Sequence, residues 1–147
     1  MNTVPRILVV DDEAAFCELC AGWLAAAGYQ VESAGTLADA QSTLVSFDAD
    51  LVLLDLSMPP SYDPADTLAQ MARLGTRPII VLTGHAQREL ALQATARGAW
   101  DFLAKPVDPE LLAVVIRRAL AQRHLTQALQ RLQQPDTGQI LARLVGV

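Results

Sequence analysis

The sequence predicts a doubly wound α/β fold, in which helices cover both faces of a five-stranded parallel sheet. Five short apolar runs alternate with longer helical patterns along the chain, as in folds built from repeated strand–helix units. The first, third and fourth runs are almost continuously apolar, which is typical of strands that are covered on both faces. Glycines stand where three of the helical patterns end.

The expected elements follow one another in regular alternation. The strands are expected at RILVV (6–10), YQVESA (29–34), DLVLL (50–54), PIIVL (78–82) and WDFLA (100–104). The helices are expected at 14–27, 37–47, 65–74 and 87–97, and a long final helix starts at Pro109. Gly28, Gly75 and Gly98 follow the first, third and fourth helices, where a residue that tolerates left-handed geometry ends a helix.

The composition favours one folded domain with a short appendage. Hydrophobic residues make up 52% of the 147 residues, which argues for a filled core and against disorder. The formal net charge of −5 gives this segment no electrostatic basis for binding nucleic acid. No run has the length of a membrane span or the pattern of a signal peptide. We therefore expect a soluble, cytoplasmic protein without membrane association.

Cys17 and Cys20 form a C-x-x-C pair inside the first helical pattern. A structural zinc site needs four ligands, and the sequence holds no second pair. A thioredoxin-like pair would stand at the start of a helix, whereas this one lies further in. We expect two unreactive thiols near the helix core.

Polar residues follow the strands of the predicted sheet. In open parallel sheets, ligands bind beyond the carboxyl ends of the strands. The residues at these ends are Asp11, Asp12 and Glu13 after the first strand, Asp55 after the third, Thr83 and Gly84 after the fourth, and Lys105 and Pro106 after the fifth. We expect these acids, the hydroxyl and the lysine to converge on one edge.

Two interpretations compete for Asp11 and Asp12. One of them could cap the first helix, because Asp suits a helix N-terminus. A cap needs only one residue, however, and consecutive acids beside Asp55 would repel each other unless a cation neutralised them. Carboxylate oxygens with open positions suit Mg²⁺. The three acids together favour a magnesium site.

Asp55 is followed by LSMPP, and the prolines prevent a helix from starting directly after it. Its carboxylate then faces the ligand-binding edge, where it could attack phosphorus and form an aspartyl phosphate. Thr83 could donate to a phosphoryl oxygen, and Lys105 could neutralise the acids or hold the phosphoryl group. Pro106 favours an extended Lys105 and permits a cis peptide bond. We interpret His85 as a bystander, because no nucleophile with an orienting acid is within its reach.

Four motifs together resemble the receiver domain of two-component response regulators: VVDDE, LLDLSMP, VLTG and FLAKP. They occur in the order and spacing of that family, and the resemblance covers roughly residues 5–122. It implies a flavodoxin-like strand order 2-1-3-4-5. It also implies a sensor histidine kinase as partner, and a protein that is no enzyme but a phosphoacceptor that assists its own phosphorylation and dephosphorylation.

The resemblance implies a role for each matching residue. Asp55 would be the phosphoacceptor, Lys105 would pair with the phosphoryl group, and Thr83 would hydrogen-bond it. Thr83 and Phe102 would form a switch that re-poses the surface of the fourth helix, the fifth strand and the fifth helix.

The resemblance also implies a magnesium site. Its ligands would be Asp11, Asp12, Asp55 and the backbone carbonyl of Ser57, with Asp12 a more direct ligand than Asp11. One departure concerns the loop that follows. The family commonly continues M-P-x-x-D-G, whereas this chain reads MPPSYDPAD, so the conformation of the acceptor loop and the lifetime of the phosphoryl group are open.

From Pro109 the helical pattern continues past the length that a receiver needs, up to Pro135. We interpret residues 1–122 as the receiver domain, 123–134 as a linker extension of its last helix, and 135–147 as a linker and candidate start of a truncated output domain. A coiled-coil seam is expected at Leu111, Val114, Arg118, Ala121, Leu125, Ala128 and Leu132. A homodimer through this helix, or through the surface of the fourth helix, fifth strand and fifth helix, competes with a solvated linker helix.

The motifs TGH and GAWDFLAKP, the long helix and the terminal LVG look like activators of the NtrC/DctD type. In those proteins an AAA+ ATPase and a helix-turn-helix domain follow the receiver, and the ATPase acts on sigma-54 polymerase. Transcription activation would then belong to another part of the protein, since this segment contains no Walker motif.

Two other classes remain open on the residues alone. A haloacid-dehalogenase-like, Mg-dependent phosphohydrolase also uses a strand-end Asp, but it requires D-x-D, and Ser57 holds the second place. A flavodoxin-like cofactor binder would need a loop rich in Ser, Thr and Gly after the first strand, and this loop is acidic. The receiver is the preferred hypothesis.

Overall fold

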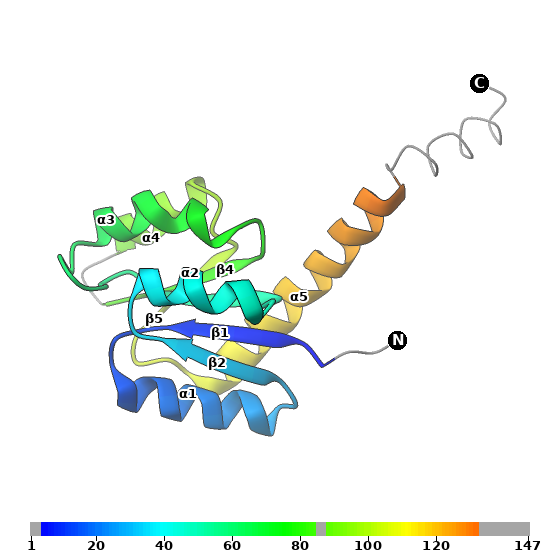
Figure 1. The fold of residues 1–147 in the computed structure, drawn as a ribbon, viewed down its shortest axis with the longest axis horizontal. Helices are drawn as coiled ribbons and strands as arrows, with labels where there is room; N and C mark the ends of the chain where they lie inside the picture. Colours follow the sequence, from blue (N-terminus) through cyan, green and yellow to red (C-terminus); the bar gives the residue numbers. More distant parts are fainter. Residues whose placement is uncertain (1–3, 85–87, 133–147) are drawn as a thin grey trace, which may run out of the picture.

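Five parallel strands form one sheet in the order β2-β1-β3-β4-β5 (Figure 1). The computed structural model describes residues 4–84 and 88–132. Within them the strands are β1 (Arg6–Val10), β2 (Gln30–Ala34), β3 (Leu51–Asp55), β4 (Ile79–Thr83) and β5 (Asp101–Ala104). Every pair of neighbouring strands is parallel. The strand order and the parallel sheet that the sequence predicts are confirmed.

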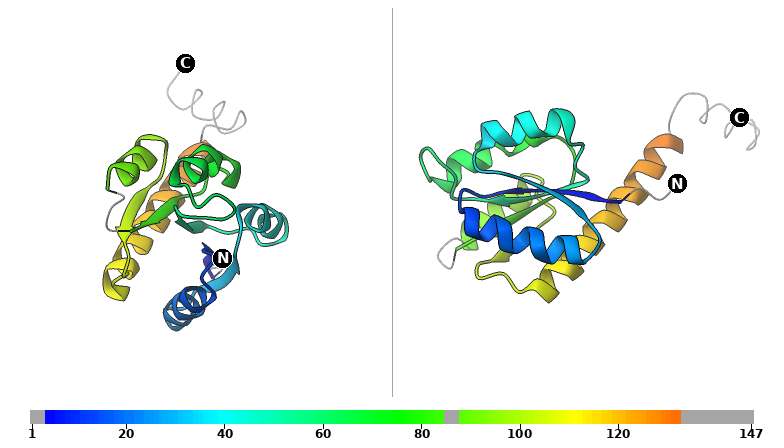
Figure 2. Two further views of the ribbon diagram at one scale, coloured as in Figure 1. Left: turned by 90° about the vertical axis from the view of Figure 1, so that its left-hand side faces the viewer. Right: turned by 60° about the horizontal axis from the view of Figure 1, so that its bottom comes forward.

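Helices cover both faces of this sheet, as Figures 1 and 2 show. One layer packs against each face. The first layer consists of α1 (Ala14–Ala26) and α5 (Pro109–Leu132), and the second of α2 (Leu37–Ser46), α3 (Pro64–Gln70) and α4 (Arg88–Ala96).

The central strands explain the continuous apolar runs. Every residue of β3 and β4 is buried. Along β3, Leu51 and Leu53 pack in the cluster beneath α1 and α5, whereas Val52 and Leu54 pack in the cluster on the opposite face. Because successive side chains point to opposite faces, a strand with helices on both sides needs apolar residues at every position.

Several element boundaries differ from the expected ones. β4 begins at Ile79 rather than at Pro78, since proline has no N–H to donate to the ladder. β3 includes Asp55, because the ladder continues past it and the N–H of Leu56 donates to the carbonyl of Leu82 at 3.1 Å. The helix expected over 65–74 divides into α3 and a 3₁₀ turn, η1 (Met71–Leu74), which ends at Gly75 with φ of 90°.

The two thiols lie in the apolar cluster between α1 and the sheet. Cys17 and Cys20 are buried and form no disulfide. Burial raises the pKa of Cys20 to about 12 and also raises that of Cys17, so both thiols stay protonated at neutral pH. The predicted burial of both cysteines is confirmed, and their low reactivity stays a prediction.

α5 has two parts with different surroundings. Its first half packs onto the sheet through Leu112, Val115, Ile116, Ala119 and Leu120. Its second half extends away from the sheet as far as Leu132 (Figure 1). None of the helices in the described ranges is long and apolar enough to cross a membrane. The linker expected at 135–147 lies outside the described residues.

Two leucines of α1, one buried and one exposed, test by the same substitution which face of the helix packs in the core. Leu24 is 3% exposed and Leu19 is 52% exposed. We expect Leu24→Ala to lower the free energy of unfolding by about 2–5 kcal/mol, because it leaves a cavity in the core. We expect Leu19→Ala to change it by no more than about 0.5 kcal/mol. Urea unfolding of both variants measures the difference, and equal losses would contradict the assignment.

Candidate functional site

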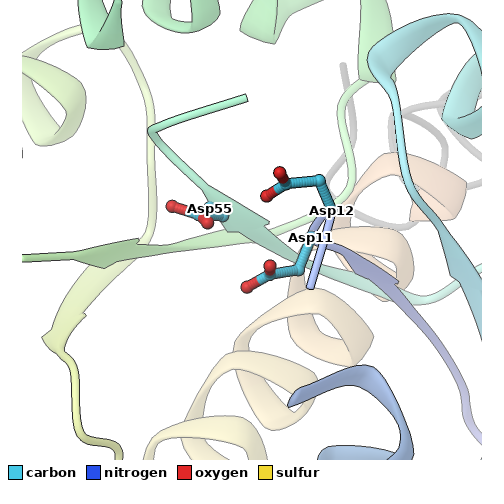
Figure 3. Close-up of side chains that lie close together, drawn as sticks. All are labelled: Asp11, Asp12 and Asp55. Atoms are coloured by element: carbon cyan, nitrogen blue, oxygen red, sulfur yellow. The ribbon is translucent and has the colours of Figure 1, made fainter. Parts of the chain in front are cut away.

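Three carboxylates meet where β1 and β3 end. Asp11 and Asp12 directly follow β1, and Asp55 is the last residue of β3, its neighbour in the sheet. Each offers an oxygen that lies within 4.8 Å of the others (Figure 3). Asp11 and Asp55 are buried, at 1% and 7% exposed, whereas Asp12 is exposed. The convergence predicted from strand ends is confirmed for these residues.

Lys105, at the end of β5, places a positively charged ammonium group beside this acidic cluster. Its Nζ donates to Oδ2 of Asp11 at 2.6 Å and to Oδ2 of Asp55 at 3.3 Å, and it lies 3.5 Å from the carboxylate of Glu13. The ammonium also lies over the ring of Phe16, 4.4 Å from its centre, which favours the charged form further. The Lys105–Pro106 peptide bond is cis.

The backbone holds Asp11 and Asp55 in the same way. The N–H of Glu13 donates to Oδ1 of Asp11 at 2.9 Å, and the N–H of Ser57 donates to Oδ1 of Asp55 at 3.0 Å. In both residues one oxygen is bound to the following backbone and the other to Lys105. The two carboxylates are therefore fixed before any ligand arrives.

The helix caps are other residues. The N-cap of α1 is Glu13, without a side-chain hydrogen bond, so the interpretation of Asp11 or Asp12 as its cap is wrong. The N-cap of α3 is Asp63, which accepts from the N–H of Ala65 at 3.0 Å. Asp55 caps no helix, as predicted. The acids at the site are thus free of a helix-capping role.

The charges of the site perturb each other's ionisation. Burial raises the pKa of Asp55, and the charge of Asp11 adds to this, while the backbone N–H of Ser57 and the charge of Lys105 oppose it. Burial by itself lowers the pKa of Lys105, but the hydrogen bond to Asp11 and the nearby charge of Asp55 outweigh it, so the net shift is upward. Lys105 therefore stays charged, whereas ionisation of the buried Asp55 costs free energy.

Thr83 and Phe102 lie on neighbouring strands beside the cluster. Thr83 is buried, and its hydroxyl donates to the carbonyl of Leu103 at 3.5 Å. Phe102 is half-buried against the apolar cluster beneath α2, α3 and α4. His85, the interpreted bystander, lies outside the described residues.

Sequence reasoning missed Tyr62. The charge of Asp12 raises the pKa of the Tyr62 hydroxyl. Tyr62 also has a φ of 58°, a left-handed conformation that costs a non-glycine residue about 1–2 kcal/mol. The departure of MPPSYDPAD from the family pattern pointed to this loop, but the sequence did not show that Tyr62 would adopt a left-handed backbone.

The acidic cluster is chemically suited to a hard divalent cation. Three carboxylates face one lysine ammonium, so the group retains net negative charge. Carboxylate oxygens with room for water are the ligands that Mg²⁺ prefers. An open cleft of about 350 Å³ borders Asp11 and Asp12, so solvent reaches the cluster on that side.

The chain belongs to the response regulator receiver domain family, whose model matches residues 7–117. Receiver domains are signalling modules rather than enzymes. Within the described residues, the parallel five-stranded sheet with the cluster at its carboxyl edge agrees with this family. The resemblance inferred from the four motifs is confirmed.

Relatives of this chain include transcription regulators of the NtrC family. The chain is 31% identical over 135 residues to the regulatory protein AtoC of Escherichia coli, covering 91% of this chain and 29% of AtoC. It is 36% identical over 139 residues to the nitrogen assimilation regulatory protein NtrX of Azorhizobium caulinodans, covering 89% of this chain and 30% of NtrX.

A solved structure agrees. The receiver domain of NtrX from Brucella abortus superposes with a TM-score of 0.71 and 32% identity, covering 78% of this chain and 98% of that one. The chain spans about 30% of the length of AtoC and NtrX.

The pKa of Asp55 gives a testable pH dependence. We expect Asp55→Asn to raise the free energy of unfolding at neutral pH in the absence of divalent cations. The reason is that a neutral amide replaces a buried carboxylate whose pKa is raised. Because the folded-state pKa lies above the unfolded one, the wild type gains stability as pH falls through it, and the advantage of the variant shrinks.

Urea unfolding at neutral and acidic pH measures this difference. Asp66→Asn is the matched control, because Asp66 is exposed on α3. If Asp55→Asn is no more stable than the wild type at neutral pH, or if its gain in the free energy of unfolding grows on acidification, the ionised Asp55 carboxylate does not destabilise the fold as assigned.

Proposed function

We propose that this chain is a phosphorylation-switched receiver whose Asp55 accepts a phosphoryl group from a sensor histidine kinase. The observation that carries the proposal is the pairing of the buried Asp55 carboxylate with Lys105 beside two further acids. Asp11, Asp12, Asp55 and the backbone carbonyl of Ser57 hold Mg²⁺. When bound, the cation neutralises charge on the transferring phosphoryl group.

The side chains of the site position the transfer. A carboxylate oxygen of Asp55 attacks phosphorus, and the bond from phosphorus to the histidine nitrogen of the kinase breaks, with its electron pair left on nitrogen. The backbone N–H of Ser57 holds Asp55 in place through Oδ1. Lys105 already contacts Asp55, and it moves its hydrogen bond to a phosphoryl oxygen as charge accumulates there. Asp11 keeps Lys105 at the site throughout.

The switch starts from the hydroxyl of Thr83. Its bond to the carbonyl of Leu103 is long, at 3.5 Å, and a phosphoryl dianion on the next strand is a stronger acceptor. When Thr83 turns to the phosphoryl group, it releases the backbone of β5 beside Phe102. Phe102 then repacks inward, and the surface formed by α4, β5 and α5 changes.

Transcription activation, the proposed output, requires parts of the protein other than this receiver. The relatives AtoC and NtrX are regulatory proteins of about three times this chain's matched length. We place the chain as the receiver of a cytoplasmic, sigma-54-dependent transcription activator. Its phosphorylation controls dimerisation and a downstream output domain.

The second half of α5 supports self-association. Leu125, Leu129 and Leu132 are 56%, 50% and 49% exposed, and their spacing of four and three is the seam of a coiled coil. Leu129 stands next to Ala128, which the seam expected from the sequence places between Leu125 and Leu132, and Arg118 interrupts that seam nearer the sheet. A homodimer that pairs these leucines, with or without the surface of α4, β5 and α5, buries apolar area that the monomer leaves in water.

Acetyl phosphate with Mg²⁺ tests the phosphoacceptor. We expect the wild-type chain to gain one phosphoryl group in intact-mass spectra, and Asp55→Asn to gain none. Asp66→Asn, an exposed acid on α3, is the matched control and should label fully. Full labelling of Asp55→Asn would overturn the proposal, and turnover of p-nitrophenyl phosphate would instead favour a phosphohydrolase.

Sedimentation tests the helix seam. We expect the double variant Leu125→Gln/Leu129→Gln to weaken self-association by at least about tenfold in Kd, since two exposed leucines leave the interface. Leu19→Gln removes an equally exposed leucine from α1 and should leave the Kd unchanged. An unaltered Kd in the double variant would place the dimer interface elsewhere.

A further inference from the structure

The ring of Phe16 lies against the ammonium group of Lys105. Nζ of Lys105 is 4.4 Å from the centre of the ring, a distance at which an aromatic face attracts a cation. Phe16 belongs to the first turn of α1 and is partly buried, since it packs against the apolar cluster beneath α1 and α5. The N–H of Cys17 donates to the carbonyl of Glu13 at 3.1 Å, so the helix fixes the backbone beside the ring.

Phe16 differs in kind from the other partners of Lys105. Those partners are carboxylates: Asp11 at 2.6 Å, Asp55 at 3.3 Å and Glu13 at 3.5 Å. In the proposed transfer, Lys105 exchanges its bond to Asp55 for a bond to a phosphoryl oxygen. A ring attracts a cation through its quadrupole and carries no net charge. It therefore keeps its hold on the ammonium while the charges around it change, and it does not repel an incoming phosphoryl group as a further acid would.

The side chain of Lys105 needs such a permanent contact. Lys105 is the one lysine of the sequence, so no second lysine replaces it at the phosphoryl group. Its ammonium stands on a flexible four-carbon stem, and the side chain is 22% exposed. A contact that restricts this stem before the reaction removes an entropy cost from the transfer itself.

We propose that Phe16 is a positioning residue for phosphoryl transfer: its ring holds the Lys105 ammonium at the carboxyl end of β3 before and after Asp55 gains the phosphoryl group. The inference rests on the proposed function. Phe16 acts through Lys105 and takes no part in bond making or breaking. Loss of the aromatic face should slow the transfer without preventing it, because Asp11 still pairs with Lys105.

Stepwise fluorination of the ring is the primary test, because fluorine withdraws electron density from the aromatic face while the ring keeps nearly its size. The full chain is prepared with one, three or five fluorine atoms on the ring of Phe16, and it is phosphorylated by saturating acetyl phosphate with Mg²⁺. We expect the rate constant to fall at each step, by about three- to tenfold over the series, the scale of a partly exposed cation–π contact. Acetyl phosphate is the donor so that no contact between a kinase and α1 enters the rate.

Phe47 supplies the matched control. Its ring lies 5.8 Å from the guanidinium of Arg6 at the start of β1, whereas the acidic cluster lies beyond the other end of that strand. Fluorination of Phe47 should leave the rate unchanged. A rate that is equal across the Phe16 series, or that falls as much in the Phe47 series, overturns the inference.

Two ordinary substitutions repeat the test. Phe16→Leu keeps an apolar side chain in the cluster but removes the aromatic face, and we expect it to slow phosphorylation as much as full fluorination does. Phe16→Tyr keeps the face and should retain the wild-type rate. Circular dichroism verifies that each variant is folded. A wild-type rate in Phe16→Leu would overturn the inference.

Nuclear magnetic resonance measures the contact without reference to a rate. Because Lys105 is the one lysine, lysine-selective carbon-13 labelling gives a single ε-CH₂ signal. Protons above an aromatic face shift upfield, so we expect an upfield signal in the wild type, before and after phosphorylation, that moves downfield in Phe16→Leu. A wild-type signal that loses its upfield shift on phosphorylation overturns the inference, because the ring has then released the ammonium.

The outcomes separate this inference from the proposed function. If the wild-type chain gains no phosphoryl group, or if Asp55→Asn gains one, the proposed function fails and the inference fails with it. If Asp55 is phosphorylated at one rate through the whole Phe16 series, the phosphoacceptor stands and the positioning role of Phe16 is refuted.

Discussion

The ion pairs of Lys105 with Asp11 and Asp55 are the interaction on which the rest of the site depends. Two buried carboxylates this close raise each other's pKa unless a cation stands between them. The ammonium contacts them at 2.6 and 3.3 Å, and the backbone N–H groups of Glu13 and Ser57 hold the opposite oxygens. The acids are thereby fixed before any ligand arrives, and three carboxylates that face one ammonium leave the cluster net negative charge for a further cation.

The fold makes this arrangement possible because parallel strands end at one edge. The central strands are buried on both faces, so their ends are held rigidly between two helix layers. In the proposed switch, a change of charge on β3 acts on β4, where the hydroxyl of Thr83 donates to the backbone of β5. Phe102 lies beside that bond at the rim of the apolar cluster. One strand, β4, therefore separates the site on β3 from the surface at β5 that the site would control.

The acceptor loop complements Lys105 from the other side. Lys105 pairs with the buried acids, and the charge of the exposed acid, Asp12, raises the pKa of the Tyr62 hydroxyl. The left-handed backbone at Tyr62 is disfavoured for tyrosine, so the conformation is imposed by the loop's anchors at Met58 and Asp63. The ends of the parallel strands thus set one side of the site, and the loop between β3 and α3 contributes the N–H of Ser57, which holds Asp55.

The sequence by itself determined the family and its strand order, the parallel sheet with helices on both faces, and the convergence of Asp11, Asp12, Asp55 and Lys105. The reason is that apolar periodicity and the positions of strand ends are local patterns with a fixed geometric consequence. Only the tertiary structure decided that Glu13, rather than Asp11 or Asp12, stands at the start of α1, and that Tyr62 adopts a left-handed backbone. Those contacts depend on loop conformations between elements, where backbone torsions follow from the packing of distant segments. Residue order alone does not fix them.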